Sequence, residues 1–429
     1  MDVPRRILHP PRSPLDRFST NANVLQKIDG SLGVIACFFL TVCRRMADAF
    51  AGAGAGVPSP EKILFIKLAE QGSTVLAHET IRRAVQKVGA GNVYFLLFEE
   101  NRFILDLLGL VPHANVLTIR TKSPGQMIVS CLARLWQIRR LRIDTCIDME
   151  FFVRATAGLC WMTGARTRVG FHAYFGEGPY RGDLLTHRVL YNPHQHASST
   201  FTSLAMALDL DGASLPTFPV KAPPGSPPPP FEPSADERDV VAALLQSLMP
   251  EGCRRLILLN ANASDLLPLR KWESANYLEL ARRLLAEFPD VAIGFTGAPE
   301  EQAKVEELVR QLGSPRAFCL AGRTSLRQLL IVYGFADVLV TNDSGPAHFA
   351  TLTSVDVVVL FGPETPLLFG APSPRNHALW AGIACSPCVN AYNNRQTACR
   401  NNVCMQMITV NLVFETVCRV HRQRKSPGN

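Results

Sequence analysis

The feature that most limits the folds open to this chain is a regular alternation of short apolar strands with helical segments, which occurs twice. The first series of expected strands lies at 63–67, 92–98, 116–119, 145–148 and 168–172. The second lies at 255–260, 291–296, 318–320, 337–340 and 355–361. Helical segments are expected at 74–88, 127–141, 274–288, 299–312, 325–335 and 408–422. Strands that alternate with helices form parallel sheets with helices on both faces, so the sequence predicts two α/β units.

A proline-rich segment separates the two series. Residues 216–233 include consecutive prolines at 227–230, and this composition gives a stiff linker. With 429 residues, the chain is too long for one ordinary core. Beyond residue 60 we therefore expect an N-terminal domain at 61–215, a linker at 216–236, a C-terminal domain at 237–407 and a final helix with a basic tail at 408–429.

The first 60 residues belong to neither series. Residues 1–22 are rich in proline and arginine, which indicates a disordered arm. An apolar run follows at 32–43 and ends at Arg44 and Arg45. Because a membrane-spanning helix needs about 20 apolar residues, we expect a short helix that lies on the cytoplasmic face of a membrane. A helix packed on the protein's own surface is the alternative, and a true span is the least favoured interpretation.

The positive charge of the chain is unevenly distributed. Its formal net charge is +8, and no acidic residue occurs from Gly109 to Ile143. That segment contains the basic residues Arg120, Lys122, Arg134, Arg139, Arg140 and Arg142. A basic face of this kind suits nucleic acid, anionic lipid or a phosphorylated acceptor, although an ordinary solvated face is the alternative. The sequence has no zinc-finger, RNP or helix-turn-helix signal, so we do not expect nucleic acid as a partner.

The cysteines are not spaced like a secreted disulfide framework. Most of them occur singly in apolar surroundings, as buried cytosolic thiols do. These are Cys37, Cys43, Cys131, Cys146, Cys160, Cys253 and Cys319. The apolar run near the N-terminus starts late and lacks a convincing processing site, so no cleavable signal peptide is expected. These observations favour a cytoplasmic protein.

Two neighbouring strands of the second series end in polar turns. The strand at 337–340 is followed by a turn in which Asp343 or Ser344 can cap the next helix, and Gly345 lets the backbone approach a ligand. The free N–H groups and the dipole of a helix start favour phosphate. The strand at 355–361 ends in the sequence Gly-Pro-Glu-Thr-Pro.

Together with the sequence Cys-Ser-Pro-Cys at 385–388, these turns resemble glycosyltransferase family 9, the heptosyltransferase family, over about residues 61–415. The resemblance implies the GT-B architecture, in which two doubly wound Rossmann-like domains face each other across a cleft and the ligand lies at the strand carboxyl ends. It also implies inverting, metal-independent transfer of a heptose or similar sugar from a nucleotide-diphosphate sugar to lipopolysaccharide core or a related glycolipid. We expect such an enzyme to lie peripherally on the inner face of the bacterial inner membrane.

The resemblance places donor binding in the C-terminal domain. One segment is the loop after the strand at 255–260, followed by a basic pair in which Arg270 stands where the family usually has a lysine. The other segment is the helix start near Ser344. The predicted donor residues are Asn260, Asn262, Arg270, Lys271, Asp343, Ser344, Gly345, Pro346 and His348.

The predicted general base departs from the family pattern. Family members have a lysine, a short polar loop and then Gly-Asp at a helix start, and that aspartate is the base. Here Lys67 is present, but Ser73 occupies the aspartate position, and a neutral hydroxyl cannot serve as base near pH 7. We predict that Glu70 is the base, that Ser73 caps the helix or touches the acceptor, and that Lys67 belongs to the same catalytic group. A nucleotide-sugar binding protein without activity and a GT-B-like sugar epimerase are the alternatives.

Two further groups have predicted roles. Acceptor binding is assigned to side chains near the ends of expected strands in the N-terminal domain, namely Glu100, Arg102, Arg168 and His172. The spacing of four cysteines suits a zinc knuckle, and the family shows a similar cluster at this place. These are Cys385, Cys388, Cys399 and Cys404. Reduced thiols, a structural zinc and a disulfide remain open, and no cofactor is expected to be required.

Overall fold

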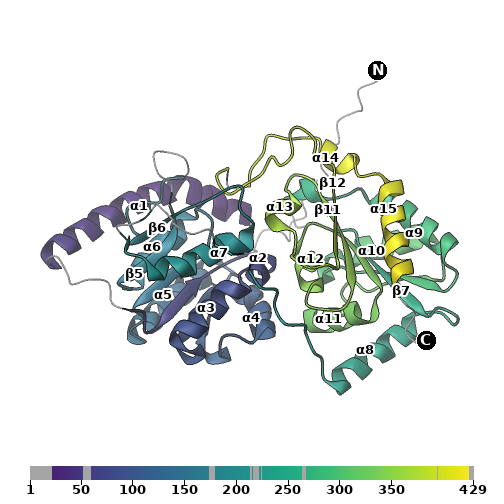
Figure 1. The fold of residues 1–429 in the computed structure, drawn as a ribbon, viewed down its shortest axis with the longest axis horizontal. Coiled ribbons are helices and arrows are strands. Elements are labelled where there is room, and N and C mark those ends of the chain that lie inside the picture. The colour runs from purple at the N-terminus through teal and green to yellow at the C-terminus, as the bar shows by residue number, and fades with distance from the viewer. Residues whose placement is uncertain are drawn as a thin grey trace.

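The computed structural model describes residues 22–51, 59–172, 179–212, 215, 222–223, 225–262, 267–393 and 395–424. Two α/β domains lie side by side, and each is built on a six-stranded parallel sheet (Figure 1). The predicted fold class is therefore confirmed. The predicted disordered arm, apart from its last residue, lies outside the described residues.

The N-terminal sheet has the strand order β3-β2-β1-β4-β5-β6. Its strands are β1 (Ile63–Ile66), β2 (Val93–Phe98), β3 (Val116–Ile119), β4 (Thr145–Asp148), β5 (Thr167–His172) and β6 (His187–Leu190). Side chains of a strand alternate between the two faces of its sheet. In β1, Ile63 and Phe65 join the core under one layer of helices, while Leu64 and Ile66 join the core under the other.

Helices cover both faces of this sheet. One layer contains α2 (Gln71–Leu76), α3 (His78–Val88), α4 (Arg102–Leu108) and α7 (Ala197–Met206), and the other contains α5 (Pro124–Arg140) and α6 (Arg154–Met162). The single helix expected at 74–88 is in fact two helices that meet at Ala77, where ψ is 2° and departs from the helical value.

The C-terminal sheet has the order β12-β11-β10-β7-β8-β9. Its strands are β7 (Arg255–Asn260), β8 (Val291–Phe295), β9 (Ala317–Cys319), β10 (Val338–Asn342), β11 (Asp356–Phe361) and β12 (Asn376–Trp380). Its helices are α8 (Ala235–Leu248), α9 (Ser274–Glu287), α10 (Gln302–Leu312), α11 (Leu326–Phe335), α12 (Gly345–Ala350), α13 (Pro366–Phe369), α14 (Val403–Gln406) and α15 (Val410–Gln423).

Both sheets follow the doubly wound order 3-2-1-4-5-6 when their strands are numbered within each domain. The strand order reverses direction between β1 and β4 in one domain and between β7 and β10 in the other. Ligands of such sheets bind beside this reversal, at the carboxyl ends of the strands. The topology therefore points to the loops that follow these strands.

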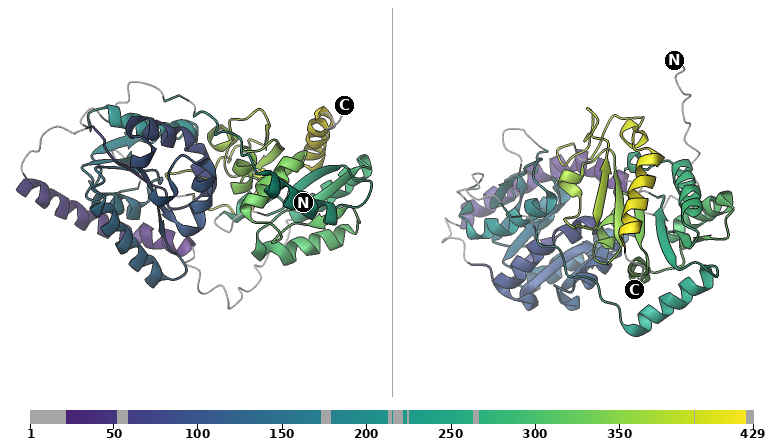
Figure 2. Two further views of the ribbon diagram at one scale, coloured as in Figure 1. Left: turned by 90° about the horizontal axis from the view of Figure 1, so that it is seen from below. Right: turned by 45° about the vertical axis from the view of Figure 1, so that its right-hand side comes forward.

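The N-terminal helix differs most from its prediction. The helix α1 (Ala22–Ala51) has 30 residues and extends well beyond the apolar run at 32–43. Within it, Leu25–Phe50 is long and apolar enough to cross a membrane by length and composition alone. The helix lies along the outer flank of the N-terminal domain and packs against α6 (Figure 2).

One face of α1 is bound to the domain over several turns. The carboxylate of Asp29 accepts hydrogen bonds from the backbone of Arg154 and Ala155, the latter at 2.7 Å. Farther along the helix, Thr41 Oγ1 accepts from the backbone N–H of Asp183 at 2.8 Å, and Arg44 forms an ion pair with the Asp183 carboxylate. The opposite face exposes the apolar side chains Ile28, Leu32, Ile35, Phe38, Phe39, Val42 and Met46.

Candidate functional site at the domain junction

The two helix starts predicted to form the site meet across the domains. The start of α2 in the N-terminal domain contacts α12 in the C-terminal domain. A Cβ atom on Gly72 would lie 2.6 Å from Cδ2 of His348 and 3.5 Å from Cα of Gly345. Since the first distance is too short for any side chain, only glycine permits this approach. The junction therefore brings Glu70 of one domain to the predicted donor segments of the other.

The loop before α2 presents Glu70 in an unusual conformation. Glu70 is the residue immediately before the helix and has φ 68° and ψ 80°, a left-handed conformation that is rare for residues other than glycine. Its carboxylate forms an ion pair with Arg395 of the C-terminal domain. Ser73 does not cap the helix, because it lies in the first turn and its hydroxyl donates to the Glu70 carbonyl at 2.8 Å. Ser73 thus fixes the turn that carries Glu70.

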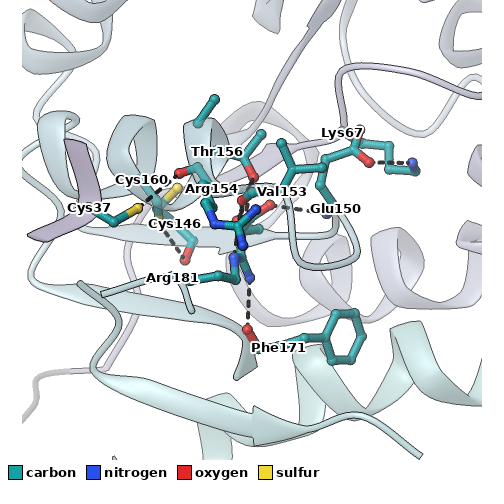
Figure 3. Close-up of polar contacts among 12 residues, drawn as sticks. Cys37, Lys67, Cys146, Glu150, Val153, Arg154, Thr156, Cys160, Phe171 and Arg181 are labelled. Atoms are coloured by element: carbon teal, nitrogen blue, oxygen red, sulfur yellow. Dashed lines mark hydrogen bonds and ion pairs between the residues drawn. The ribbon is translucent and has the colours of Figure 1, made fainter. Parts of the chain in front are cut away.

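A buried ion pair anchors the same loop. Lys67 Nζ lies 3.0 Å from Oε2 of Glu150, and Oε1 of Glu150 accepts from the backbone N–H of Ala69 at 3.0 Å (Figure 3). Burial lowers the pKa of Lys67, and the neighbouring Glu150 opposes that shift. Lys67 thus helps to hold the loop that carries Glu70, and its catalytic role stays a prediction. Sequence reasoning missed Glu150, although it closely follows an expected strand, as ligand residues of this fold do.

A second buried ion pair joins the ends of β4 and β5. Arg181 pairs with Asp148 and donates to the Phe171 carbonyl at 2.7 Å (Figure 3). The hydroxyl of Thr156 donates to Asp148 at 2.9 Å. Burial raises the pKa of Asp148, while Arg181 opposes that rise. This ion pair and these hydrogen bonds hold the ends of β4 and β5 together on the N-terminal side of the junction.

Asparagines connect the loops after β7 and β10. The side chain of Asn260 accepts from the backbone N–H of Asn262 at 3.1 Å. The side chain of Asn342 donates to the Asn262 carbonyl at 2.9 Å and accepts from the backbone N–H of Trp272 at 3.0 Å. Asn342 was not predicted as a site residue, yet it sets the spacing of both predicted donor segments.

Charged groups converge beside these loops. Arg270 ends a short 3-10 turn (Pro268–Arg270), pairs with Glu364, and has its Nε 3.6 Å from Oδ2 of Asp343. Burial alone would lower the pKa of Arg270, but the two carboxylates outweigh it and the pKa is raised. Burial raises the pKa of Glu364 to about 8, although Arg270 opposes this rise. Glu364 and Arg270 therefore form a coupled buried pair.

Replacement of Glu364 by glutamine is expected to change how stability depends on pH. The raised pKa means that protonated Glu364 stabilises the fold fully below about pH 4.5, and this contribution is lost as pH rises through about 8. Glutamine lacks this titration. The free energy of unfolding of Glu364→Gln relative to wild type should therefore increase between pH 5 and pH 8, as measured by urea denaturation. Exposed Glu300→Gln is the matched control, and an equal difference at both pH values would contradict the prediction.

The remaining predicted donor residues surround the start of α12. Ser344 precedes the helix, and its hydroxyl donates to the Asn342 carbonyl at 3.0 Å. Gly345 and Pro346 form the first turn of this six-residue helix. His348 is buried, and burial lowers its pKa to about 4, so its imidazole is neutral at pH 7. Lys271 is half-buried and lies near Glu301.

The predicted acceptor residues divide into two pairs. Arg102 donates to the His113 carbonyl at 2.8 Å, beside the start of β3, and Arg168 donates to the Leu184 carbonyl at 2.7 Å from near the start of β5. The structure does not bring these two arginines to the junction, because their guanidinium groups bind carbonyl groups near the amino ends of β3 and β5. Glu100 follows the carboxyl end of β2, and His172 is the last residue of β5. The Glu100 carboxylate accepts a hydrogen bond from the Thr121 hydroxyl. Burial lowers the pKa of His172 to about 4.

The cysteine-rich segment lies next to Glu364. The backbone N–H of Cys388 donates to the Pro363 carbonyl at 3.0 Å, and Cys404 is buried against Gly362. All four thiols are free, and within the described part of the chain no group of three or more cysteine, histidine or acidic side chains has the spacing of a metal site. The structural zinc therefore stays a prediction.

The sequence is similar to a family of known proteins and to curated members of that family. The family model described as glycosyltransferase family 9 (heptosyltransferase) matches residues 132–398. Lipopolysaccharide heptosyltransferase 2 of Salmonella typhimurium is 36% identical over 101 residues, which is 23% of this chain and 29% of that protein. The Escherichia coli K12 protein of the same name gives the same identity and coverage. The alignments to these curated relatives thus span less than a third of their length.

Solved structures with the same fold include two from E. coli. The ADP-heptose lipopolysaccharide heptosyltransferase II has a TM-score of 0.63 at 20% identity, covering 84% of this chain and 99% of that one. Heptosyltransferase WaaC with ADP-2-deoxy-2-fluoro heptose has a TM-score of 0.53 at 16% identity, and the match covers 83% of this chain and 99% of that one. Because the family model spans more than half of the sequence, and the fold agrees with it, this chain belongs to glycosyltransferase family 9, the heptosyltransferase family.

Proposed function

We propose that this protein is an inverting glycosyltransferase that transfers a heptose from ADP-heptose to lipopolysaccharide core or a related glycolipid. Family membership supports glycosyl transfer, and the names of the relatives support heptose and lipopolysaccharide. The fold relative WaaC, described with an ADP-heptose analogue, supports ADP as the nucleotide. The observation that carries the proposal is the contact of α2 with α12, which places the Glu70 loop against the predicted donor loops.

The proposed reaction uses one base and several cations. The Glu70 carboxylate accepts the proton of the acceptor hydroxyl while that oxygen bonds to the anomeric carbon from the face opposite the leaving group. The bond from the anomeric carbon to the diphosphate oxygen breaks, and ADP keeps the electron pair. Arg270 and Lys271 stabilise the developing negative charge. Of the predicted acceptor residues, Glu100 and His172 remain as contacts for the acceptor.

We further propose that transfer requires no metal ion. Basic side chains at the junction supply positive charge to the diphosphate, as they do in sites that bind phosphate through arginine. Activity should therefore persist in the presence of a chelator. The alternative of a sugar epimerase is not favoured by family membership, and that of an inactive binding protein is tested by turnover.

The protein is proposed to work peripherally on the inner face of the bacterial inner membrane. The exposed side chains of α1 form a continuous apolar stripe, which suits an interfacial helix. Contacts from Asp29 to Arg44 hold the other face of α1 to the domain, so a spanning orientation would carry the flank of that domain into hydrocarbon. Helix α5 exposes Val129, Leu132 and Trp136 and carries basic residues that suit anionic lipid.

Stabilisation by ADP tests the donor proposal. At 100 times its dissociation constant, ADP should raise the free energy of unfolding of the wild type by about 2.7 kcal/mol. Arg270→Lys retains the positive charge and should keep most of this effect, whereas Arg270→Gln should lose it. Thermal shifts with ADP, UDP and GDP provide the measurement, with all variants compared against their own ligand-free state. Failure of every diphosphate to stabilise the wild type would rule against the proposed function.

A further inference from the structure

One arginine crosses from the C-terminal domain to the N-terminal domain. Arg395 lies in the loop between β12 and α14 and forms an ion pair with Glu70. Its Nε also lies 3.5 Å from Oε1 of Glu364, an oxygen with no hydrogen-bond partner among the described residues. A single guanidinium therefore stands between one carboxylate from each domain, directly at the junction.

Aromatic contacts hold this loop against the N-terminal domain. The hydroxyl of Tyr392 donates to the Tyr191 carbonyl at 2.7 Å, and its ring stacks on Phe152 with centroids 5.3 Å apart. The backbone N–H of Arg395 donates to the Asn390 carbonyl at 3.0 Å, which closes the turn that carries the guanidinium. The position of Arg395 beside Glu70 is thus fixed by packing as well as by charge.

The other cations of the junction are paired within their own domains. Arg270 is enclosed by Glu364 and Asp343, and Lys67 is fully buried against Glu150. Arg395 differs from both, because it lies between Glu364 of its own domain and Glu70 of the other domain. Burial lowers the pKa of Arg395 to about 10, so it remains a cation at pH 7, whereas burial raises that of Glu364 to about 8. Of the two carboxylates beside Arg395, only that of Glu70 joins the two domains.

We propose that Arg395 exchanges partners when the donor binds, leaving the Glu70 carboxylate and binding the diphosphate of the nucleotide sugar. The planar guanidinium offers paired N–H donors that match phosphate oxygens. Once released, Glu70 is free to accept the proton of the acceptor hydroxyl. Donor binding thereby prepares the base, and an enzyme without donor keeps that base paired. This inference rests on the proposed function and deepens it.

Binding of ADP to a set of variants tests the exchange. Arg395→Gln should weaken ADP binding about tenfold, because it removes a charge-assisted contact. Glu70→Gln should tighten ADP binding severalfold, because it removes the carboxylate that competes for Arg395. In the double variant the tightening should be absent, since it depends on Arg395. Isothermal titration calorimetry on the full-length protein measures all four affinities.

Two further variants separate charge from structure. Arg395→Lys keeps a cation but loses the paired donors, so its affinity should lie between those of wild type and Arg395→Gln. Arg400→Gln removes an exposed arginine of the same loop and should leave affinity unchanged. Circular dichroism establishes that each variant is folded.

The possible results are distinct. Unchanged or weaker ADP binding by Glu70→Gln, or tightening that persists without Arg395, would overturn the partner exchange while leaving the proposed function intact. If the wild type binds none of ADP, UDP and GDP, the proposed function fails and the exchange fails with it.

Discussion

Glu70→Gln is expected to lower kcat about 10²- to 10⁴-fold, the contribution typical of a general base. Glutamine has nearly the size of glutamate but cannot accept the proton of an acceptor hydroxyl at neutral pH. The variant should still bind ADP, because the predicted donor residues belong to the C-terminal domain. Release of ADP from ADP-heptose in the presence of a lipopolysaccharide core acceptor measures kcat, and calorimetry measures ADP binding.

The matched control is Ser73→Ala, which alters the residue at the position of the family aspartate. The Ser73 hydroxyl donates to the Glu70 carbonyl, so its removal costs about 1 kcal/mol of stability and should reduce kcat by no more than about tenfold. A loss of activity in Ser73→Ala as large as that in Glu70→Gln would contradict the assignment of the base. Wild-type protein that binds ADP but shows no turnover with any core acceptor would instead favour the inactive binding protein.

Much of the fold was predictable because buried parallel strands are continuous apolar runs. The expected strands at 116–119, 145–148 and 255–260 match β3, β4 and β7 to the residue. Two of the four edge strands, β6 and β12, were not predicted, for the converse reason. Residues of β6 and β12 are partly exposed and include histidine, arginine and asparagine, so their sequences look like loops. Pairing with one neighbour, which no local pattern records, makes them strands.

The candidate site was predictable where a residue follows a strand directly. Asn260 and Asp343 are at or next to the ends of β7 and β10 and gather at the junction as expected. Arg102 and Arg168 were misplaced, because spacing along the chain does not show at which end of the sheet a long side chain finds its partner. Arg395 was missed altogether, since its partner Glu70 is distant in sequence and on the other domain.

The length of α1 shows a different limit of sequence reasoning. The apolar run at 32–43 marked only the most hydrophobic part, while the structure has a helix with one bound face and one exposed face. The bound face is partly polar, since Asp29, Thr41 and Arg44 form contacts with the domain. Those contacts depend on α6 and on residues near Asp183, so a hydropathy pattern alone could not separate an interfacial helix from a spanning one.

Replacement of Leu32, Phe39 and Met46 together by serine is expected to release the protein from anionic vesicles. These side chains lie on the exposed face of α1, with Leu32 60% and Phe39 61% exposed, so the change should not disturb the core. Partial transfer of such side chains out of water contributes about 4 kcal/mol in total, which corresponds to roughly a thousandfold in vesicle partitioning. Flotation with vesicles of phosphatidylethanolamine and phosphatidylglycerol measures the bound fraction.

A triple serine variant on the C-terminal domain separates this effect from general surface polarity. Val240, Leu367 and Met407 are also exposed apolar residues, and their replacement should leave flotation unchanged. The basic residues of α5 add attraction to anionic headgroups, so wild-type binding should weaken at high salt while the apolar part persists. If the α1 variant floats as well as the wild type, α1 does not contact the membrane. If sedimentation instead shows that the same variant loses a dimer, the exposed face of α1 serves a second copy of the chain.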